Sequence, residues 1–395
     1  MDAPVLPSAG ETLVPGVVVK TAHAPAQHPR EALATLVREM GDEDLSLVVL
    51  FVSPSGDLPA IAAEAAAVFG ATPVIGCSTA GEISPRGYTE GEIVAVGFPK
   101  SHFVALIQFV ADLKAMLRKD VVRSTVKLRG ELARVAPQWT SEFAFLMVDG
   151  LSLLEDQLVS ALSTALGPTP LFGGSAGDGL DFKQTFVIHE GRVHRDAAVL
   201  ALIRTDCAIK VFNFDHLTPT ERKMVVTEAD PERRVVREIN GEPAAREYAR
   251  LLGMDPEQLS PFIFAAHPVV VKVGGKHHVR AIQKVEPNGD LTFFSAIDEG
   301  LVLTLADPRD IARDLDAALG DLALRSRPQA IIACDCILRR VEAEQKQAIR
   351  ALSGILSANK VVGFSTYGEQ LNSVHVNQTM TGIAIYAPPG GKKAP

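Results

Sequence analysis

Short apolar runs and amphipathic stretches alternate along most of the chain. Runs such as Leu45 to Val52 are continuous, of strand length and rich in Val, Leu and Phe, which is typical of strands covered on both faces of a sheet. Stretches such as Leu154 to Leu166 carry leucines every four positions, the spacing of a helix that buries one face. This alternation predicts an α/β fold in which helices cover the sheets.

The alternation repeats three times in one order, which predicts three related strand-helix-strand units. Each unit is expected to contain a helix, an apolar strand, a second helix, a Gly-x-Ser string and a final strand. The helices are predicted at 29–40, 60–69, 128–135, 154–166, 310–322 and 342–356, and the strings are PVIGCSTAGE, PLFGGSAGD and KVVGFSTYGE. We expect the three strings to occupy comparable positions in the fold.

A segment of different character, 227–306, separates the second unit from the third. It predicts a helix at 244–252 followed by β-type runs at 262–273, 277–285 and 291–297, with a hairpin turn at Pro287 to Asp290. We interpret it as an inserted, mainly β module. The ends, 1–28 and 387–395, are predicted to be flexible.

Composition narrows the functional classes. A formal net charge of −8 repels nucleic-acid phosphates, and no stripe of Lys and Arg offsets it, so the composition predicts no nucleic-acid partner. The apolar runs fall short of a membrane span, which predicts a soluble protein with no membrane partner. The opening residues, MDAPVLPSAG, lack the features of a secretory signal, and this favours the cytoplasm, where four cysteines stay reduced.

The repeated strings resemble the FIST family of bacterial sensory domains. The landmarks are VIGCSTAGEI, LFGGSAGDGLDF, VVGFSTYGEQ and the middle segment INGEPAAREYARLLG, which resembles the family's pivot. The resemblance implies a FIST N-type domain at 29–226 and a FIST C-type domain at 227–386. It also implies a non-enzymatic sensor of a small ligand, such as an amino acid, that acts through a separate output protein.

Residues next to the strings are candidates for ligand binding. A hydroxyl and a carboxylate just after a strand can hydrogen-bond a polar ligand, although the same groups can cap the turns. Arg280 alternates with apolar residues and can bind a ligand carboxylate through its planar fork; an exposed arginine on a sheet is the alternative. The predicted ligand-binding residues are Ser78, Glu82, Ser175, Asp178, Arg280, Ser365 and Glu369.

The string VHVNQT around His375 suggests a second ligand, haem. It resembles a haem-binding, nitric-oxide-sensing subgroup of the family whose members are often encoded near histidine kinases, which implies a kinase as the output partner. In that reading His375 is the axial ligand. Alternation places His375, Asn377 and Thr379 on one polar face, which opposes a deep haem pocket.

Two short motifs suggest other chemistries. The sequence around Ser175 matches the Gly-x-Ser-x-Gly string of hydrolases, but Asp178 and Gly179 predict a turn where a nucleophile elbow needs a helix. Cys334 and Cys336 share one strand face, yet zinc needs more ligands than this pair supplies, so buried structural thiols are favoured. We therefore predict no catalytic residues and no metal ligands.

Overall fold

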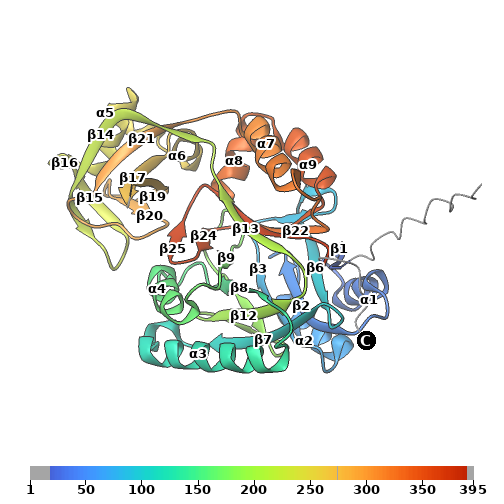
Figure 1. Cartoon of the computed structure of the whole chain (residues 1–395). Coiled ribbons are helices and arrows are strands. Elements are labelled where there is room, and N and C mark those ends of the chain that lie inside the picture. The colour runs from blue at the N-terminus through green and yellow to red at the C-terminus, as the bar shows by residue number, and fades with distance from the viewer. Residues whose placement is uncertain (1–17, 274, 389–395) are drawn as a thin grey trace, which may run out of the picture.

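Three α/β units follow one another in the computed structural model, which describes residues 18–273 and 275–388 (Figure 1). The order of elements and strands in each unit, given below, confirms the predicted threefold repeat. The first unit contains β1 (Lys20–Pro25), α1 (Pro29–Met40), β2 (Leu45–Val52), α2 (Leu58–Phe69), β3 (Val74–Ser78), β4 (Glu82–Ser84), β5 (Gly87–Thr89) and β6 (Glu92–Pro99). The second contains β7 (Phe103–Val110), the 3-10 helix η1 (Leu113–Ala115), α3 (Arg118–Val135), β8 (Ser141–Val148), α4 (Glu155–Leu166), β9 (Leu171–Ser175), β10 (Val187–His189), β11 (Arg192–His194) and β12 (Ala198–Thr205).

The third unit begins before the inserted module and resumes after it. It contains β13 (Ile209–Phe214), α7 (Ile311–Ala323), β22 (Ala330–Cys336), α8 (Ile337–Gln345), α9 (Ile349–Ala358), β23 (Val361–Thr366), β24 (Glu369–Leu371), β25 (Val374–Val376) and β26 (Met380–Ile385). The sequence predicted one helix at 342–356, but Gln347 has a left-handed φ of 55° that separates α8 from α9.

The units exchange hairpins, so each sheet is completed by a different unit. Each unit supplies four strands of a six-stranded sheet, and a hairpin from another unit adds the last two. The hairpin β10–β11 pairs with β3, β24–β25 pairs with β9, and β4–β5 pairs with β23. The strand orders are β1-β6-β2-β3-β10-β11, β25-β24-β9-β8-β12-β7 and β13-β26-β22-β23-β4-β5.

Each hairpin joins its host sheet beside a Gly-x-Ser string. The strings form β3, β9 and β23, which are parallel to β2, β8 and β22. At Gly76, Gly173 and Gly363 a β-carbon would lie 2.4, 2.3 and 1.8 Å from a carbonyl oxygen of that parallel neighbour. The glycines are therefore required for close approach of the backbones.

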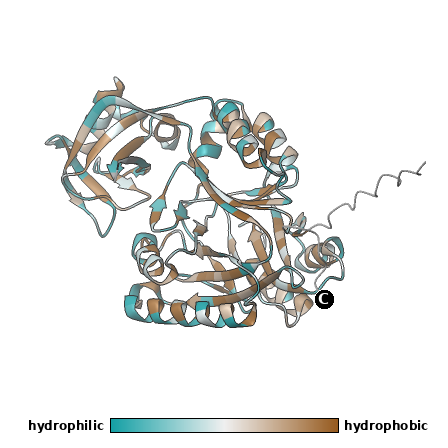
Figure 2. Cartoon of the chain, in the orientation of Figure 1, coloured by the Kyte–Doolittle hydropathy of each residue, from teal (hydrophilic) through white to brown (hydrophobic). Residues whose placement is uncertain are grey.

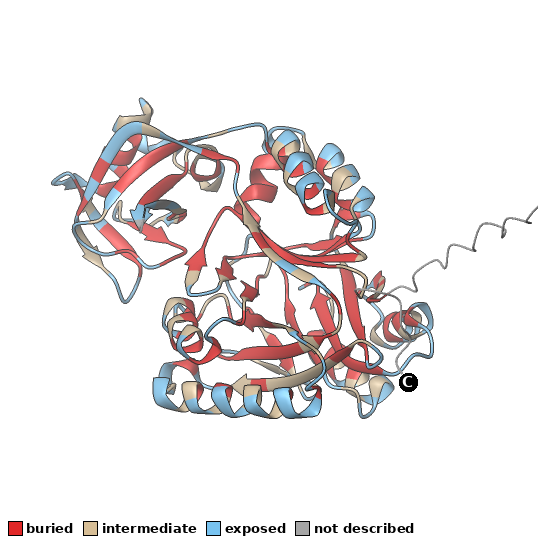
Figure 3. Ribbon diagram, viewed as in Figure 1, coloured by how far each residue is buried: buried red, intermediate tan, exposed pale blue. Residues whose placement is uncertain are grey.

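The inner faces of the three sheets meet in one central core. Phe51 of β2 stacks on Phe364 of β23 at 4.7 Å between ring centroids and meets Phe145 of β8 edge-on at 6.3 Å. The outer faces are covered by α1 and α2, by α3 and α4, and by α7 and α9, each through its own apolar cluster. Figure 3 shows the strands buried and the helices exposed on their outer sides, and Figure 2 shows the matching concentration of hydrophobic residues on the sheets.

The inserted module lies to one side of the three units (Figure 1) and is built on an antiparallel sheet. It spans β14 to β21, residues 217–308, which extends the predicted segment at both ends. The stretch 262–266, predicted as strand, is helix α6, because Pro261 at its first turn suits a helix start. The elements are β14 (Leu217–Asp230), β15 (Val235–Ile239), β16 (Glu242–Pro243), α5 (Ala244–Leu252), η2 (Pro256–Gln258), α6 (Pro261–Ala266), β17 (Val269–Val273), β18 (Lys276–Val279), β19 (Ile282–Val285), β20 (Leu291–Phe293) and β21 (Val302–Pro308).

Two further predictions concern the ends and the domain boundary. The prediction that 1–28 is flexible is wrong for Lys20–Pro25, which pairs with β6 along its whole length. Residues 1–17 and 389–395 lie outside the described residues. The boundary expected between 226 and 227 falls inside β14. Within the described residues, the helices are too short or too polar to cross a membrane.

The glycine contacts generate a stability prediction. Gly173→Ala is expected to lower the free energy of unfolding by about 2 to 3 kcal/mol, because its β-carbon would meet the backbone of β8 and loosen the attachment of β24. Thermal and urea unfolding measure this. Gly130→Ala is the control: this α3 glycine has open space around it, so alanine should raise stability by about 0.5 to 1 kcal/mol. Equal effects of the two substitutions would contradict the close-approach argument.

Candidate functional site

The three string serines lie where the hairpins cross between units. Ser78, Ser175 and Ser365 are buried, and the backbone N–H of each donates to a carbonyl of another unit. The distances are 3.0 Å from Ser78 to Phe186, 2.8 Å from Ser175 to Gly368 and 2.7 Å from Ser365 to Gly81. The main chain of each string therefore fastens one unit to the next.

Two buried carboxyl groups fasten the hairpins further. The hydroxyl of Thr79 donates to Glu82, and that of Thr366 donates to Glu369 at 2.6 Å. Glu369 also accepts hydrogen bonds from Thr379, from its N–H at 3.3 Å and from its hydroxyl at 2.8 Å. Burial raises the pKa of Glu82 to about 7 and that of Glu369 to about 8, against the threonine hydrogen bonds that lower it. These contacts are internal, so a role for either carboxyl in ligand binding stays a prediction.

Asp178 organises the loop that follows β9. Its carboxylate accepts backbone hydrogen bonds from Phe182 at 2.9 Å and Gln184 at 2.7 Å, and one from the hydroxyl of Tyr367. Phe182 packs on Tyr367 at 4.6 Å and on Phe294 of the inserted module at 5.6 Å between ring centroids. The loop thus links the second unit, the third unit and the module.

Unpartnered polar atoms gather where the module faces the hairpin β24–β25. Gln370 Oε1, His375 Nε2 and Asn377 Oδ1 are buried on the third unit, and Arg280 Nε is buried on the module; none has a hydrogen-bond partner among the described residues. We name Arg280, Gln370, His375 and Asn377 the seam cluster. Buried polar atoms are nearly always hydrogen-bonded, so such a group indicates a place for a polar ligand.

Short contacts and charge place the members of the seam cluster together. Gln370 Nε2 lies 2.9 Å from the hydroxyl of Ser175 and 3.2 Å from His375 Nδ1. Asn377 Nδ2 donates to the carbonyl of Tyr367 at 3.2 Å. The charge of Arg280 is near enough to His375 to contribute to its pKa. Of the predicted ligand-binding residues, Ser175 is therefore hydrogen-bonded to the cluster, and Arg280 lies within electrostatic range of His375.

A buried ion pair holds the module at this place. Arg234 of the module is 3% exposed, and its guanidinium lies 2.6 Å from Glu155 and 3.2 Å from Asp156, the first two residues of α4. The same guanidinium donates to the carbonyl of Phe294. Acidic residues in a first helical turn are favourably placed, and pairing them satisfies a charge that is costly to bury alone.

The surroundings of His375 favour a neutral imidazole. The side chain is 2% exposed, and burial lowers its pKa. The carboxylates of Glu155 and Asp156 act in the opposite direction, while Arg234 and Arg280 add to the lowering. A neutral ring presents one donor and one acceptor nitrogen, which suits hydrogen bonding to a ligand.

This environment does not fit an axial haem ligand. The ring is 2% exposed, and a β-carbon on Gly368 would lie 2.6 Å from His375 Nε2, so a group as large as a porphyrin could reach that nitrogen only if the neighbouring backbone moved. The neighbours Gln370 and Asn377 are polar, whereas a porphyrin needs a broad apolar slot. Haem binding remains a prediction from the sequence.

Ser175 is not arranged as a hydrolase nucleophile. Its hydroxyl accepts a hydrogen bond from Gln370, and within the described residues none of its hydrogen bonds comes from a histidine. The residues after β9 form a loop without a helix up to β10, as the sequence indicated. The thiols of Cys334 and Cys336 are buried, as expected.

Sequence reasoning missed several residues of the site. Gln370 ends the string VVGFSTYGEQ but was not predicted as a site residue, and Asn377 lies in VHVNQT, on the same predicted strand face as His375. Arg234 and Glu155 are remote from the strings, and their pairing depends on how the module docks. The polar alternation at His375, Asn377 and Thr379 is the one signal in the sequence; it opposes haem without indicating which polar ligand binds there.

Comparison with known families matches two domain models to this chain. The FIST N domain matches residues 46–242, and the FIST C domain matches residues 244–372. Together the two matches cover most of the chain. A comparison with curated proteins found no match.

The raised pKa of Glu369 generates a pH prediction. Between its ordinary value of 4.5 and about 8, the folded protein holds this proton while the unfolded chain has lost it. The contribution of Glu369 to the free energy of unfolding is therefore fully present below about pH 4.5 and is lost as the pH rises through about 8. We expect the melting temperature of Glu369→Gln to fall less between about pH 6 and about pH 9 than that of the wild type. Glu232→Gln, at an exposed position, should keep the wild-type slope; parallel slopes for all three proteins would contradict the prediction.

The buried, polar surroundings of His375 lead to a spectroscopic prediction. When the purified chain is exposed to haem, His375→Ala should leave the position and intensity of any Soret band unchanged, since the ring is buried beside polar Gln370 and Asn377 and no broad apolar slot adjoins it among the described residues. Absorption spectroscopy of both proteins measures this. A wild-type Soret band that disappears in His375→Ala would contradict this prediction, because it would show that the imidazole ring rotates outward and binds haem.

Proposed function

Because this chain belongs to the FIST family, we propose that it is a sensory protein that binds a small carboxylate-bearing ligand, such as an amino acid, at the seam cluster. Domains of this family are regarded as small-ligand sensors in signal transduction and are not known as enzymes. The observation that supports the site is the set of unpartnered polar atoms on Arg280, Gln370, His375 and Asn377.

The chemistry of the seam cluster favours a carboxylate. The Arg280 guanidinium is mostly buried, and its one hydrogen bond among the described residues goes to the carbonyl of the adjacent Val279 at 3.2 Å. A buried guanidinium without a carboxylate partner is costly, and a ligand carboxylate supplies that partner bidentately. The amide oxygens of Gln370 and Asn377 can accept from a ligand ammonium or amide group.

Ligand binding at this place bridges two separate parts of the protein. Arg280 belongs to the module, whereas the other three residues belong to the third unit. A ligand that contacts both favours the docked arrangement, and a sensor needs such a difference in ligand contacts between two states. The output protein then recognises the position of the module; a histidine kinase in that role is implied only by the sequence resemblance.

A panel of amino acids and small carboxylates tests the proposal. At least one member should raise the melting temperature of the wild-type chain by mass action. Arg280→Met should weaken its binding about 10- to 100-fold, the usual cost of losing a charge-assisted hydrogen bond. Arg237→Met is the matched control, because this module arginine pairs with Glu228 on the surface, and it should bind as the wild type does.

Two results would overturn the proposal. The first is the absence of a melting-temperature shift with any panel member, together with native mass spectra that show no copurified small molecule. The second is binding that survives Arg280→Met but is lost in Asn213→Ala. Asn213 lines a cleft of about 770 Å³ between the module and the third unit, so this outcome would move the site to that cleft.

A further inference from the structure

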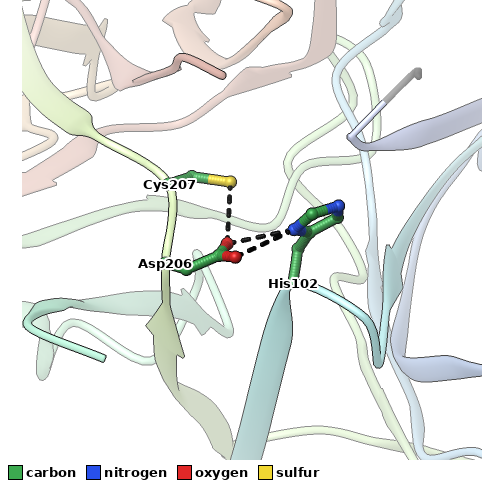
Figure 4. A group of neighbouring side chains, drawn as sticks. All are labelled: His102, Asp206 and Cys207. Carbon is green, nitrogen blue, oxygen red and sulfur yellow. Dashed lines mark hydrogen bonds and ion pairs between the residues drawn. The ribbon is translucent and has the colours of Figure 1, made fainter. Parts of the chain in front are cut away.

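The two turns that join consecutive units lie beside each other. The turn between β6 and β7 joins the first unit to the second and carries His102. The turn between β12 and β13 joins the second unit to the third and carries Asp206 and Cys207. Figure 4 shows the His102 ring and the Cys207 thiol both directed toward the Asp206 carboxylate.

The ligand atoms of these three residues form a tight group. His102 Nδ1 lies 3.1 and 3.2 Å from the two carboxylate oxygens of Asp206, and Cys207 Sγ lies 3.5 Å from one of them. One nitrogen, one oxygen and one sulfur all lie within 4.8 Å of one another. We propose that His102, Asp206 and Cys207 form a binding site for a zinc ion.

Two of the three separations match the edges of a tetrahedral zinc site. Zinc binds nitrogen and oxygen at about 2.0–2.1 Å and sulfur at about 2.3 Å, so the edges of a regular tetrahedron of such ligands are about 3.3–3.6 Å long. The observed nitrogen–oxygen and sulfur–oxygen distances differ from these edges by a few tenths of an ångström at most. The third edge, from His102 Nδ1 to Cys207 Sγ, is within 4.8 Å, so side-chain rotation that brings these two atoms to about 3.6 Å would enclose the ion.

The ligand types select zinc over the common hard cations. Magnesium and calcium prefer sites made of oxygen ligands alone, whereas a thiolate, an imidazole and a carboxylate suit zinc. Thiolate and carboxylate together carry two negative charges, which neutralise a divalent ion. The net charge of the local site is then zero, which favours an ion beside a buried thiol.

The burial of the three side chains provides both a fixed ligand and an entry path. Cys207 is fully buried and its backbone N–H donates to the Thr205 hydroxyl at 3.0 Å, which fixes the turn. The side chains of His102 and Asp206 are 32% and 30% exposed. An ion can reach the group from the exposed side, where a water molecule completes the four ligands of zinc.

The position gives the ion a structural role. The chain passes from unit to unit at these two turns, and within the described part of the chain no disulfide links them. A zinc ion would cross-link the first junction to the second. This site is remote from the seam cluster in the chain and does not depend on the proposed ligand.

Cobalt substitution tests the site directly. The full chain, without a polyhistidine tag and stripped with a chelator, is titrated with Co²⁺ and then with Zn²⁺. One equivalent of Co²⁺ should produce tetrahedral d–d bands and a thiolate-to-cobalt charge-transfer band, and Zn²⁺ should abolish both. Zinc affinity is then measured by competition with a chromophoric chelator, and zinc should raise the melting temperature.

Matched variants assign the ligands. The charge-transfer band should be lost in Cys207→Ala and retained in Cys77→Ala, which removes a different buried thiol. Zinc affinity should fall by about tenfold or more in His102→Gln and Asp206→Asn, and remain unchanged in His28→Gln, at an exposed position.

The wild-type spectrum alone can overturn the proposal, even if a variant fails to fold. Absence of a charge-transfer band with Co²⁺ would leave these residues as a hydrogen-bonded group only. A band that persists in Cys207→Ala, or zinc affinity that is unchanged in both His102→Gln and Asp206→Asn, would place the ion elsewhere.

Discussion

The pairing of each Gly-x-Ser strand with a hairpin from another unit is the constraint on which the structure depends. No unit completes its own sheet, because the outer two strands always come from elsewhere in the chain. The missing β-carbons at Gly76, Gly173 and Gly363 allow the neighbouring backbones to approach. The serine N–H groups and the buried Glu82 and Glu369 then fix the hairpins, so the three units are expected to fold as one cooperative body.

The candidate ligand site follows from one of these exchanges. The hairpin β24–β25 is held on β9 of the second unit, and this placement brings His375 beside Ser175 and the first turn of α4. The module contributes Arg280, and the ion pair between Arg234 of the module and Glu155 docks the module on α4. A ligand that contacts these parts of the chain together can shift their relative arrangement by as much as its affinities for the two arrangements differ.

Local pattern predicted most of the fold, and long-range pairing accounts for what it missed. The run Leu45–Val52 and the helix Pro29–Met40 have the predicted bounds, because their patterns reflect burial that each segment carries alone. The exchange of hairpins has no signature in the local pattern, since the residues of β4 would have the same pattern whether the strand paired within its own unit or with β23. The residues of the ligand site show the same limit. Residue type alone singled out Arg280 and His375, but the roles of Gln370 and Arg234 depend on how the module docks. Asp206 and Cys207 likewise became candidates only because the fold brings their turn beside His102.

The exchange also determines what happens when the polypeptide is divided. A cut in the inserted module separates the chain into two pieces. In the N-terminal piece β9 has lost its partner strand β24, and the hairpin β4–β5 has lost its partner strand β23. The C-terminal piece has the reciprocal deficits at β23 and β24–β25. Each piece exposes strand edges that are prone to aggregation, and the edges of one are the natural partners of the other. The fold is thus organised as a pair of complementing fragments, and the two parts matched by separate family models are expected to fold as one physical unit.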